Sequence, residues 1–245
     1  MHPISKCLLT PPFTPMATPQ TRFSSADRRE QILDVATGLF AQQGFQGTTT
    51  KLIAEKSGVT EALIFRHFPG KEELYWAVIE RKINCAAPVE RLLENLEAGG
   101  DDLEVLSRVA FEVLERRAKD QTLSRLLLYS ALEKHELSER FFRNYIANYF
   151  EVLARFVRQG IAAGRFRKVD PLLAARGFLG MVVYHSWIQE LYRGKEVQDF
   201  DPRIVGRTLA RIWLQGVKVE KKTAPGRQNV LARSKRRRHQ VKITR

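Results

Sequence analysis

Two short helical segments, joined by a tight turn that contains one glycine, constrain the fold of this chain more than any other feature. Thr49 precedes the first segment, residues 50–57, and its hydroxyl can accept from an amide of the first helical turn. Gly58 ends that segment, and Thr60 can cap a second one that reaches His67. A helix, a tight glycine turn and a second helix are typical of a helix-turn-helix. On spacing alone, an ordinary corner in a larger helical protein fits equally well.

An amphipathic helix precedes this motif. Between Arg28 and Phe40, apolar residues recur at three- and four-residue steps, which places them on one helical face: Ile32, Leu33, Ala36, Leu39 and Phe40. Gly44 is expected to end this helix, because glycine enters the left-handed region without a Cβ penalty. Phe45 then folds back onto the apolar face. Ile64 and Phe68 are expected to pack beneath the second segment of the motif, so three helices share one small core.

Five short motifs occur in order along this region without a gap: Gly44-Phe45, Thr48-Thr49, Ile53-Ala54, Ser57-Gly58-Val59 and Ile64-Phe65-Arg66-His67-Phe68-Pro69-Gly70-Lys71-Glu72-Glu73-Leu74. Together they resemble the N-terminal signature of the TetR (tetracycline repressor)/AcrR family of bacterial transcriptional regulators. The resemblance favours the helix-turn-helix interpretation. It implies an all-α homodimer that binds a palindromic operator in double-stranded DNA and carries a pocket for a small-molecule effector.

The rest of the chain also predicts helices, so we expect an all-α fold. A three-helix DNA-binding domain over residues 25–71 precedes a helical-bundle ligand-binding and dimerisation domain over 72–219. A disordered N-terminal arm over 1–24 and a basic disordered C-terminal tail over 220–245 flank them. Both flanking segments are expected either to contact DNA or to be solvated without a role.

Four helix boundaries in the second domain are predicted from local signals. Residues 122–132 form a short, strongly apolar helix of the kind that is buried, and Ser138 caps a long helix that ends near Ala163. Asp170-Pro171 and Asp201-Pro202 each begin one of the last two helices, because an N-cap followed by proline is a start signal.

The formal net charge of +14 is not independent evidence for DNA binding. Eleven Lys or Arg residues and one acid lie between Lys218 and Arg245, whereas Asp27 to Glu72 contains six basic and six acidic residues. The basic tail is the kind of segment that attracts DNA non-specifically through counterion release.

No catalytic constellation is present in the sequence. The five histidines are scattered, and HExxH, GxSxG, CxxC and glycine-rich phosphate loops are absent. Cys7 and Cys85 support neither a disulfide framework nor a metal site, and the stretch from Glu133 to Glu136 is interpreted as an exposed helix end. We therefore predict a protein that is not an enzyme and has no cofactor. Without a signal peptide or a membrane-spanning run, we expect it to be cytoplasmic and to have no membrane partner.

Ten residues around the motif are expected to contact DNA: Thr48, Thr49, Thr60, Glu61, Ala62, Leu63, Phe65, Arg66, His67 and Lys71. Threonines, aromatic residues and Lys71 are assigned to the phosphate backbone, and Glu61, Ala62, Leu63 and Arg66 to bases. Lys71 opens the next helix, where amides and ammonium can converge on one phosphate. A lysine pointing into water remains the alternative. The family commonly has tyrosine where Phe65 stands, so one hydroxyl contact to phosphate is absent.

The effector pocket and the dimer interface are assigned to the helical domain. For the pocket we expect aromatic and apolar residues on facing helices, although such stripes also occur as plain core: Phe111, Leu127, Tyr145, Tyr149 and Tyr184, with His185 and Trp187 as further candidates. The last two helices are apolar on more than one face, which predicts a four-helix contact between two subunits. Its candidate residues are Gly177, Gly180, Met181, Ile188, Leu209, Ile212 and Trp213. A helical DNA-associated or structural protein without ligand regulation is the alternative to the regulator.

Overall fold

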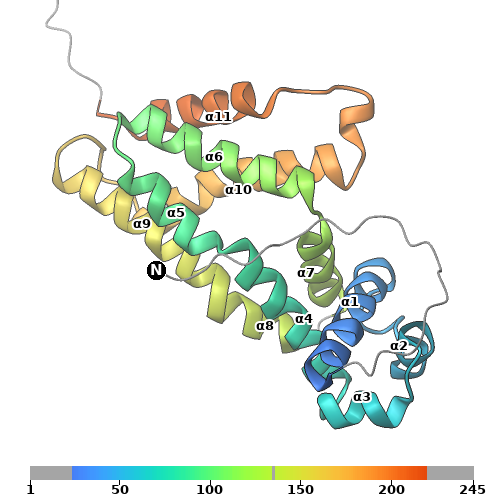
Figure 1. Ribbon diagram of the computed structural model, residues 1–245. Coiled ribbons are helices and arrows are strands. Elements are labelled where there is room, and N and C mark those ends of the chain that lie inside the picture. Colours follow the sequence, from blue (N-terminus) through green and yellow to red (C-terminus); the bar gives the residue numbers. More distant parts are fainter. Residues whose placement is uncertain (1–23, 134–135, 220–245) are drawn as a thin grey trace, which may run out of the picture.

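The computed structural model describes residues 24–133 and 136–219, and these residues form an all-α fold (Figure 1). The helices are α1 (Ser25–Gln43), α2 (Thr50–Ser57), α3 (Glu61–His67), α4 (Lys71–Ala86), α5 (Pro88–Glu97), α6 (Asp102–Lys119), α7 (Thr122–Leu132), α8 (Glu136–Phe141), α9 (Ala147–Ala162), α10 (Pro171–Glu190) and α11 (Pro202–Val217). A π segment, η1 (Phe142–Ile146), and a 3-10 turn, η2 (Gly194–Glu196), complete the set. The all-α prediction is confirmed, while the predicted tail and nearly all of the predicted arm lie outside the described residues.

The N-terminal helices begin and end where local signals place them, with one addition. Thr49 and Thr60 cap α2 and α3 through their hydroxyls, and Gly58 ends α2 in the left-handed region. Ser24, which we assigned to the arm, caps α1 and forms a capping box with Asp27. α1 therefore begins at Ser25, about two turns before Ile32, the first residue of the apolar stripe.

An N-terminal apolar cluster holds α1, α2 and α3 together and extends beyond them. At its centre Phe40 and Phe45 meet the ring of Tyr75, a fully buried α4 residue, at centroid distances of 4.8 and 5.3 Å. The Tyr75 hydroxyl donates to the carbonyl of Leu126 on α7, over 2.6 Å. α8 adds Phe141 to the same cluster. The domain boundary that we placed at residue 71 stays a prediction, but the apolar core crosses it.

The long helix after α7 differs from the prediction. Ser138 does not cap it, because α8 already begins at Glu136, and α8 runs through the π segment into α9. In this segment the amide of Ala147 donates to the carbonyl of Phe142, five residues back. The extra residue shifts the helical face, so that Tyr145 packs on the N-terminal cluster and Tyr149 on the C-terminal one.

The C-terminal apolar cluster is formed mainly by α6, α9, α10 and α11, which lie at the other end of the molecule from α2 and α3 (Figure 1). The Asp170 and Asp201 side chains accept from amides at the starts of α10 and α11, as predicted. An isolated bridge between Phe166 and Lys218 ties the α9–α10 connection to the end of α11. None of the described helices is both long and apolar enough to span a membrane.

The burial predicted for α7 is only partly correct. Leu126 is fully buried, but Leu132 is 79% exposed and the other leucines of this helix are half-buried. The physical reason is the position of α7 at the junction of the two clusters (Figure 1), where it packs α1 and α4 on one side and leaves its C-terminal end open.

Candidate nucleic-acid interface

The helix-turn-helix formed by α2 and α3 is held against α1 by specific contacts. The side-chain Nε2 of Gln31 on α1 donates to the backbone carbonyl of Ser57 at the end of α2, over 2.8 Å. The guanidinium of Arg29 lies 5.0 Å from the centroid of the Phe68 ring, just after α3. Ile64 of α3 is buried below. α3 is therefore fixed along its inner face and free along its outer face.

The outer face of α3 presents three exposed side chains. Ala62, Phe65 and Arg66 are exposed, and Phe65 has 48% of its surface accessible although it is a large apolar residue. Leu63 and His67 are half-buried beside them. Thr49 and Thr60 are exposed at the starts of α2 and α3. With Lys71 at the start of α4, eight of the ten expected residues are thus exposed or half-buried on α3 or at the starts of α2, α3 and α4.

Two of the ten expected DNA contacts are engaged elsewhere. Thr48 is fully buried and its hydroxyl donates to the carbonyl of Gly44, over 2.9 Å, so its side chain closes the α1–α2 turn and is withdrawn from the surface. Glu61 accepts from the hydroxyl of Thr50, which ties the first turn of α3 to the first turn of α2. Thr48 is thereby removed from the expected phosphate contacts, and Glu61 has one of its oxygens occupied.

Lys71 lies at the start of α4, as expected, but it is not a freely solvated lysine. Its Nζ lies 4.2 Å from the centroid of the Phe45 ring. Burial lowers the pKa of Lys71, and the nearby carboxylates of Glu133 and Glu72 oppose that effect. The ammonium is thus held at the turn between α1 and α2, on the same side of the molecule as the start of α2.

The end of α1 is held by three residues that were not predicted from the sequence, two on α7 and one just after it. Arg125 Nε donates to the carbonyl of Ala41 over 2.6 Å, and the Tyr129 hydroxyl donates to that of Gln42 over 3.0 Å. The Glu133 carboxylate accepts from the amides of the α1–α2 turn at 3.2–3.3 Å. Glu133 does end α7, as interpreted, but it is half-buried and its carboxylate is engaged with the α1–α2 turn. The Arg125 cation meets a carbonyl at the C-terminus of α1, as the helix dipole favours, and the Glu133 carboxylate accepts from two amides of the turn that follows.

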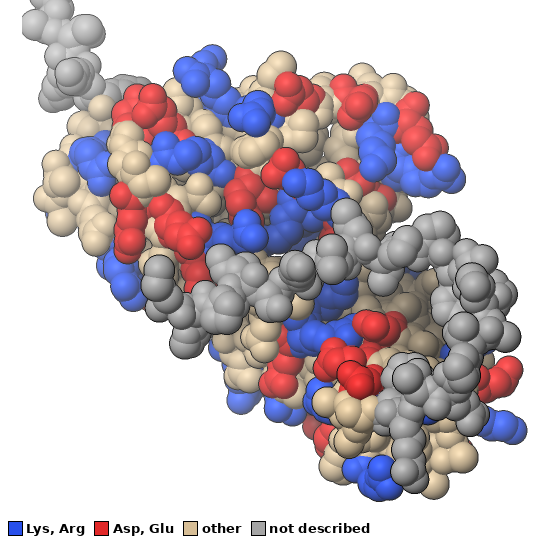
Figure 2. All heavy atoms as spheres, viewed as in Figure 1, with Lys and Arg blue, Asp and Glu red and all other residues tan. Residues whose placement is uncertain are grey.

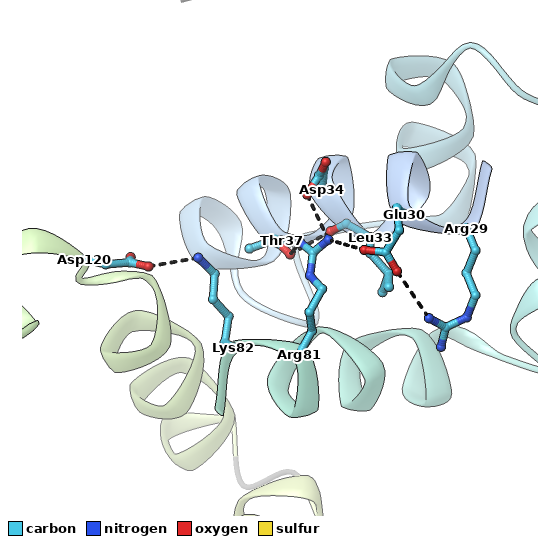
Figure 3. Close-up of polar contacts among 8 residues, drawn as sticks. All are labelled: Arg29, Glu30, Leu33, Asp34, Thr37, Arg81, Lys82 and Asp120. Atoms are coloured by element: carbon cyan, nitrogen blue, oxygen red, sulfur yellow. Dashed lines mark hydrogen bonds and ion pairs between the residues drawn. The ribbon is translucent and has the colours of Figure 1, made fainter. Parts of the chain in front are cut away.

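A polar network on the opposite side of α1 fastens this helix to α4 (Figure 3). Arg81 Nη1 lies 3.1 Å from Glu30 and 2.8 Å from Asp34, and its Nη2 donates to the Thr37 hydroxyl over 3.0 Å. The next residue of α4, Lys82, forms an ion pair with Asp120, which lies between α6 and α7. Its Nζ is 2.8 Å from an oxygen of the Asp120 carboxylate. α4 is thereby linked to α1 on one side and to the connection between α6 and α7 on the other.

Replacing Arg81 with methionine is expected to lower the free energy of unfolding by about 1–2 kcal/mol, because three hydrogen-bonded partners on α1 lose one shared donor. Arg81→Lys is the matched control for charge: it keeps the cation but lacks the planar fork, so we expect about half of the loss to remain. Urea unfolding monitored by circular dichroism measures both. If the unsubstituted protein and both variants have the same free energy of unfolding, the Arg81 network does not contribute to stability.

The charge on this end of the molecule is mixed. Figure 2 shows Lys and Arg side chains interspersed with Asp and Glu over the face viewed. This pattern agrees with the six basic and six acidic residues counted between Asp27 and Glu72. A polyanion would therefore meet no strong overall field here, and its binding would require local placement of basic side chains and helix N-termini.

The structure does not bring the five predicted pocket residues together. Leu127 and Tyr145 pack on the N-terminal cluster, whereas Tyr149 belongs to the C-terminal one. Phe111 lies under the guanidinium of Arg203, 4.4 Å from its ring centroid, and Tyr184 is 63% exposed. A cavity of about 470 Å³ lies instead where the ends of α6 and α10 meet the start of α11, and its lining includes Leu114, His185, Ser186, Gln189, Glu190 and Lys195.

The predicted dimer residues divide into a surface set and a core set. Gly177 and Gly180 are exposed, and a Cβ built on either would meet no atom within 4 Å. Ile212 is 52% exposed, while Met181, Ile188 and Leu209 are half-buried. Trp213 is different: it is buried, and its Nε1 donates to the carbonyl of Ala174 over 2.9 Å. Its assignment to the dimer surface was wrong, because this indole joins α10 and α11 within one subunit.

Two family models match the chain. Residues 32–78 match the model described as bacterial regulatory proteins, tetR family, and residues 102–205 match that of the AefR-like transcriptional repressor, C-terminal domain. The first covers α2, α3, most of α1 and the first half of α4. The second covers most of the helical bundle, so the two matches together span more than half of the sequence.

Individual relatives and solved structures agree with these matches. The chain is 33% identical over 117 residues to the HTH-type transcriptional regulator AcrR of Shigella flexneri, covering 48% of this chain and 54% of that protein. It is 28% identical over 186 residues to the nucleoid occlusion factor SlmA of Photobacterium profundum, covering 71% and 91%. The chain thus spans only about half the length of the AcrR relative.

The fold is similar to those of solved regulators. The transcriptional regulator FadR from Bacillus subtilis, in complex with stearoyl-CoA, superimposes with a TM-score of 0.61 at 21% identity, covering 76% of this chain and 98% of that one. A putative transcriptional regulator from Pseudomonas aeruginosa gives 0.63 at 23% identity, covering 80% and 92%. These likenesses establish the arrangement of helices.

Proposed function

Because the chain belongs to the TetR family of bacterial transcriptional regulators, we propose that it is a homodimeric repressor that binds a palindromic operator and is released by a small molecule. Members of this family are DNA-binding regulators and not enzymes. The observation that carries the proposal is the helix-turn-helix itself: α3 is anchored by Ile64 and presents Ala62, Phe65 and Arg66 outward.

In this proposal α3 lies in the major groove. Arg66 and Leu63 read bases, the first through hydrogen bonds and the second through contact with a thymine methyl group. Thr49, Thr60 and Lys71 hold the phosphate backbone on both sides of the groove, where the N-termini of α2, α3 and α4 present free amides. Phe65 contributes apolar contact with the sugar-phosphate backbone.

We propose that two copies associate through the exposed faces of α10 and α11. On α10, Leu173, Gly177, Gly180 and Tyr184 follow one another at helical spacing and are all exposed, with Leu173 65% and Tyr184 63% accessible. α11 adds Ile204 and Ile212, which are 67% and 52% exposed. An apolar, two-helix surface of this kind is self-complementary in a twofold dimer and becomes a four-helix contact.

Separate substitutions are expected to distinguish backbone contacts from base contacts. Lys71→Ala is expected to weaken binding of all duplexes alike by about fivefold to tenfold and to reduce the salt slope by about one unit. Leu63→Ala is expected to relax the preference at one position per half-site and to leave the salt slope unchanged. Fluorescence anisotropy with matched and singly mutated duplexes over a salt series measures both quantities. An unchanged salt slope for Lys71→Ala would remove this residue from the phosphate contacts.

The experiment that tests the proposed function is selection of binding sites from random duplex DNA, followed by footprinting and a ligand screen for release. A palindromic motif protected on both strands supports the operator-binding repressor. Binding that is salt-sensitive but yields no motif would refute it and would indicate a DNA-associated protein without sequence recognition.

A further inference from the structure

The cavity of about 470 Å³ lies at the end of the helical bundle where α10 leads into α11 (Figure 1). Its wall is formed by the last two turns of α6, the last two turns of α10 and the connection that follows α10. Small-molecule sites begin at about 300 Å³, so this cavity is large enough for an organic ligand. None of its lining residues belongs to the candidate nucleic-acid interface or to the proposed contact surface between subunits. The cavity therefore has no role in the contacts described above.

Two hydrogen bonds show how α6 and α10 run along the cavity. Arg117 Nε donates to the Ser186 hydroxyl over 2.7 Å, and Gln121 Nε2 donates to the Glu190 carboxylate over 2.9 Å. Each residue of the second pair follows its counterpart in the first pair by four positions, so the two segments run side by side in the same direction. The cavity therefore has one end near Ser186 and another near Glu190, about one helical turn apart.

The end near Ser186 is apolar and aromatic. The rings of His185 and Phe200 meet there in a T-shaped arrangement, with 5.9 Å between their centroids. Leu114, which precedes Arg117 on α6, adds an apolar side chain to the wall. Burial lowers the pKa of His185, so its imidazole is neutral at pH 7. A hydrocarbon or aromatic group of a ligand can therefore be buried at this end against apolar side chains.

The end near Glu190 is acidic. The Glu190 side chain is only 10% exposed, and its Oε2 accepts from Lys195 Nζ over 2.8 Å as well as from Gln121. Its other oxygen, Oε1, accepts no hydrogen bond in the part of the chain that the structure describes. The hydrogen bond and charge of Glu190, together with the charge of Asp199, raise the pKa of Lys195. Two carboxylates thus share one ammonium group.

The charges of the cavity wall are unbalanced. The wall contains one ammonium group, that of Lys195, and three carboxylates: Glu190, Asp199 and Asp201. Asp199 has no ion pair or hydrogen bond among the described residues. The Arg117 guanidinium lies at the opposite end of the cavity. A positive group that donates hydrogen bonds is therefore favoured at the acidic end and disfavoured at the apolar one.

We propose that this cavity binds the effector and that the effector is an amphipathic organic amine. Its ammonium group lies between Glu190 and Asp199, and its hydrocarbon or aromatic body lies against Leu114, His185 and Phe200. A carboxylate of the same shape is repelled by the acidic end, and an alcohol lacks the attraction between charges. This inference rests on the proposed function, because it names the chemical class of the molecule that releases the operator.

The cavity adjoins the proposed contact surface between subunits. Tyr184 of that surface precedes His185 on α10, and Ile204 follows Pro202 by two positions on α11. A ligand that fills the cavity fixes the connection between these two helices, and hence their relative position. Because α10 and α11 form the proposed dimer, binding at this site alters the spacing of the two α3 helices.

Three probes of similar size test the charge requirement: phenethylamine, phenethyl alcohol and phenylacetate. Isothermal titration calorimetry with the full chain is expected to show the amine binding at least about tenfold more tightly than either other probe. Asp199→Asn is expected to weaken amine binding by about threefold to tenfold and to leave alcohol binding unchanged. Phe200→Ala, which removes the ring at the apolar end, is expected to weaken amine and alcohol alike, by about threefold to tenfold.

An exposed acid outside the cavity provides the matched control. Glu196→Gln removes a carboxylate from the same connection without changing the cavity wall, and is expected to leave the amine affinity within about twofold. All three variants are expected to keep the Tm of the unsubstituted protein in circular dichroism, because the three positions are exposed. If Asp199→Asn and Glu196→Gln weaken amine binding equally, the general charge of the connection attracts the amine, and the inference is overturned.

The remaining outcomes separate this inference from the proposed function. Equal affinities for the amine and the alcohol, or no binding of the amine, would overturn the amine site even if the unliganded chain binds its operator. Selective amine binding that depends on Asp199 but does not release the operator would support the site and refute ligand-controlled repression.

Discussion

Replacing Gly44 with alanine is expected to lower the free energy of unfolding by about 3 kcal/mol or more. Gly44 ends α1 with φ 76° and ψ −179°, a combination that is nearly confined to glycine. A Cβ at this position would also meet Tyr129 Cδ1 at 2.8 Å, as well as the carboxylate of Glu133. Alanine at this position would therefore strain the backbone and would also displace the α7 side chains that pack against it.

Gly58→Ala is the matched control for this prediction. Gly58 also has a positive φ, 62°, but with ψ 34° it lies in the ordinary left-handed region, and its Cβ would meet no atom within 4 Å. We expect a loss of about 1 kcal/mol there. Urea unfolding at one fixed protein concentration measures both variants. If Gly44→Ala costs no more than Gly58→Ala, the close packing of α7 on the α1–α2 turn does not contribute to stability.

The substitution Ile212→Asp is expected to weaken the association of two subunits by at least about a hundredfold, and operator affinity with it. Ile212 is 52% exposed on α11, so a charge costs little in the folded subunit. In a twofold dimer the same position is buried in both copies, and each complex would bury two unpaired carboxylates. Sedimentation equilibrium measures the association, and anisotropy with the selected duplex measures the affinity.

Val197→Asp is the comparison for this second prediction. Val197 is 87% exposed between α10 and α11 and lies outside the proposed contact surface, so this variant is expected to stay dimeric and to bind DNA normally. Circular dichroism should show both variants folded. An Ile212→Asp protein that remains dimeric with unchanged affinity would place the interface elsewhere.

Helix boundaries could be predicted from this sequence wherever the determinant is local. Thr49, Thr60, Asp170 and Asp201 each satisfy an amide two or three residues ahead, so their pattern is visible in a short window. The π segment between α8 and α9 could not be predicted in this way, because an inserted residue is accommodated by packing against two clusters at once. The same insertion separated Tyr145 from Tyr149, two of the predicted pocket residues.

The candidate interface was predictable only in part, for a related reason. The exposed residues of α3 follow from helical periodicity and the single buried Ile64. The end of α1 is bound by Arg125, Tyr129 and Glu133, which are more than 80 positions away from their partners in the sequence. No local sequence pattern predicts such contacts. Adjacent apolar residues such as Ile212 and Trp213 also look alike in sequence, and only the packing of α10 shows which one is buried.

In the proposed dimer, two subunits hold their α3 helices at a separation that matches successive major grooves, about 34–36 Å. The most direct test is the affinity for palindromic duplexes in which the spacing between half-sites is varied one base pair at a time over a full helical turn. We expect one sharp optimum, with a loss of at least about a hundredfold when the half-sites lie on opposite faces of the duplex. Affinity that does not depend on the spacing would contradict it.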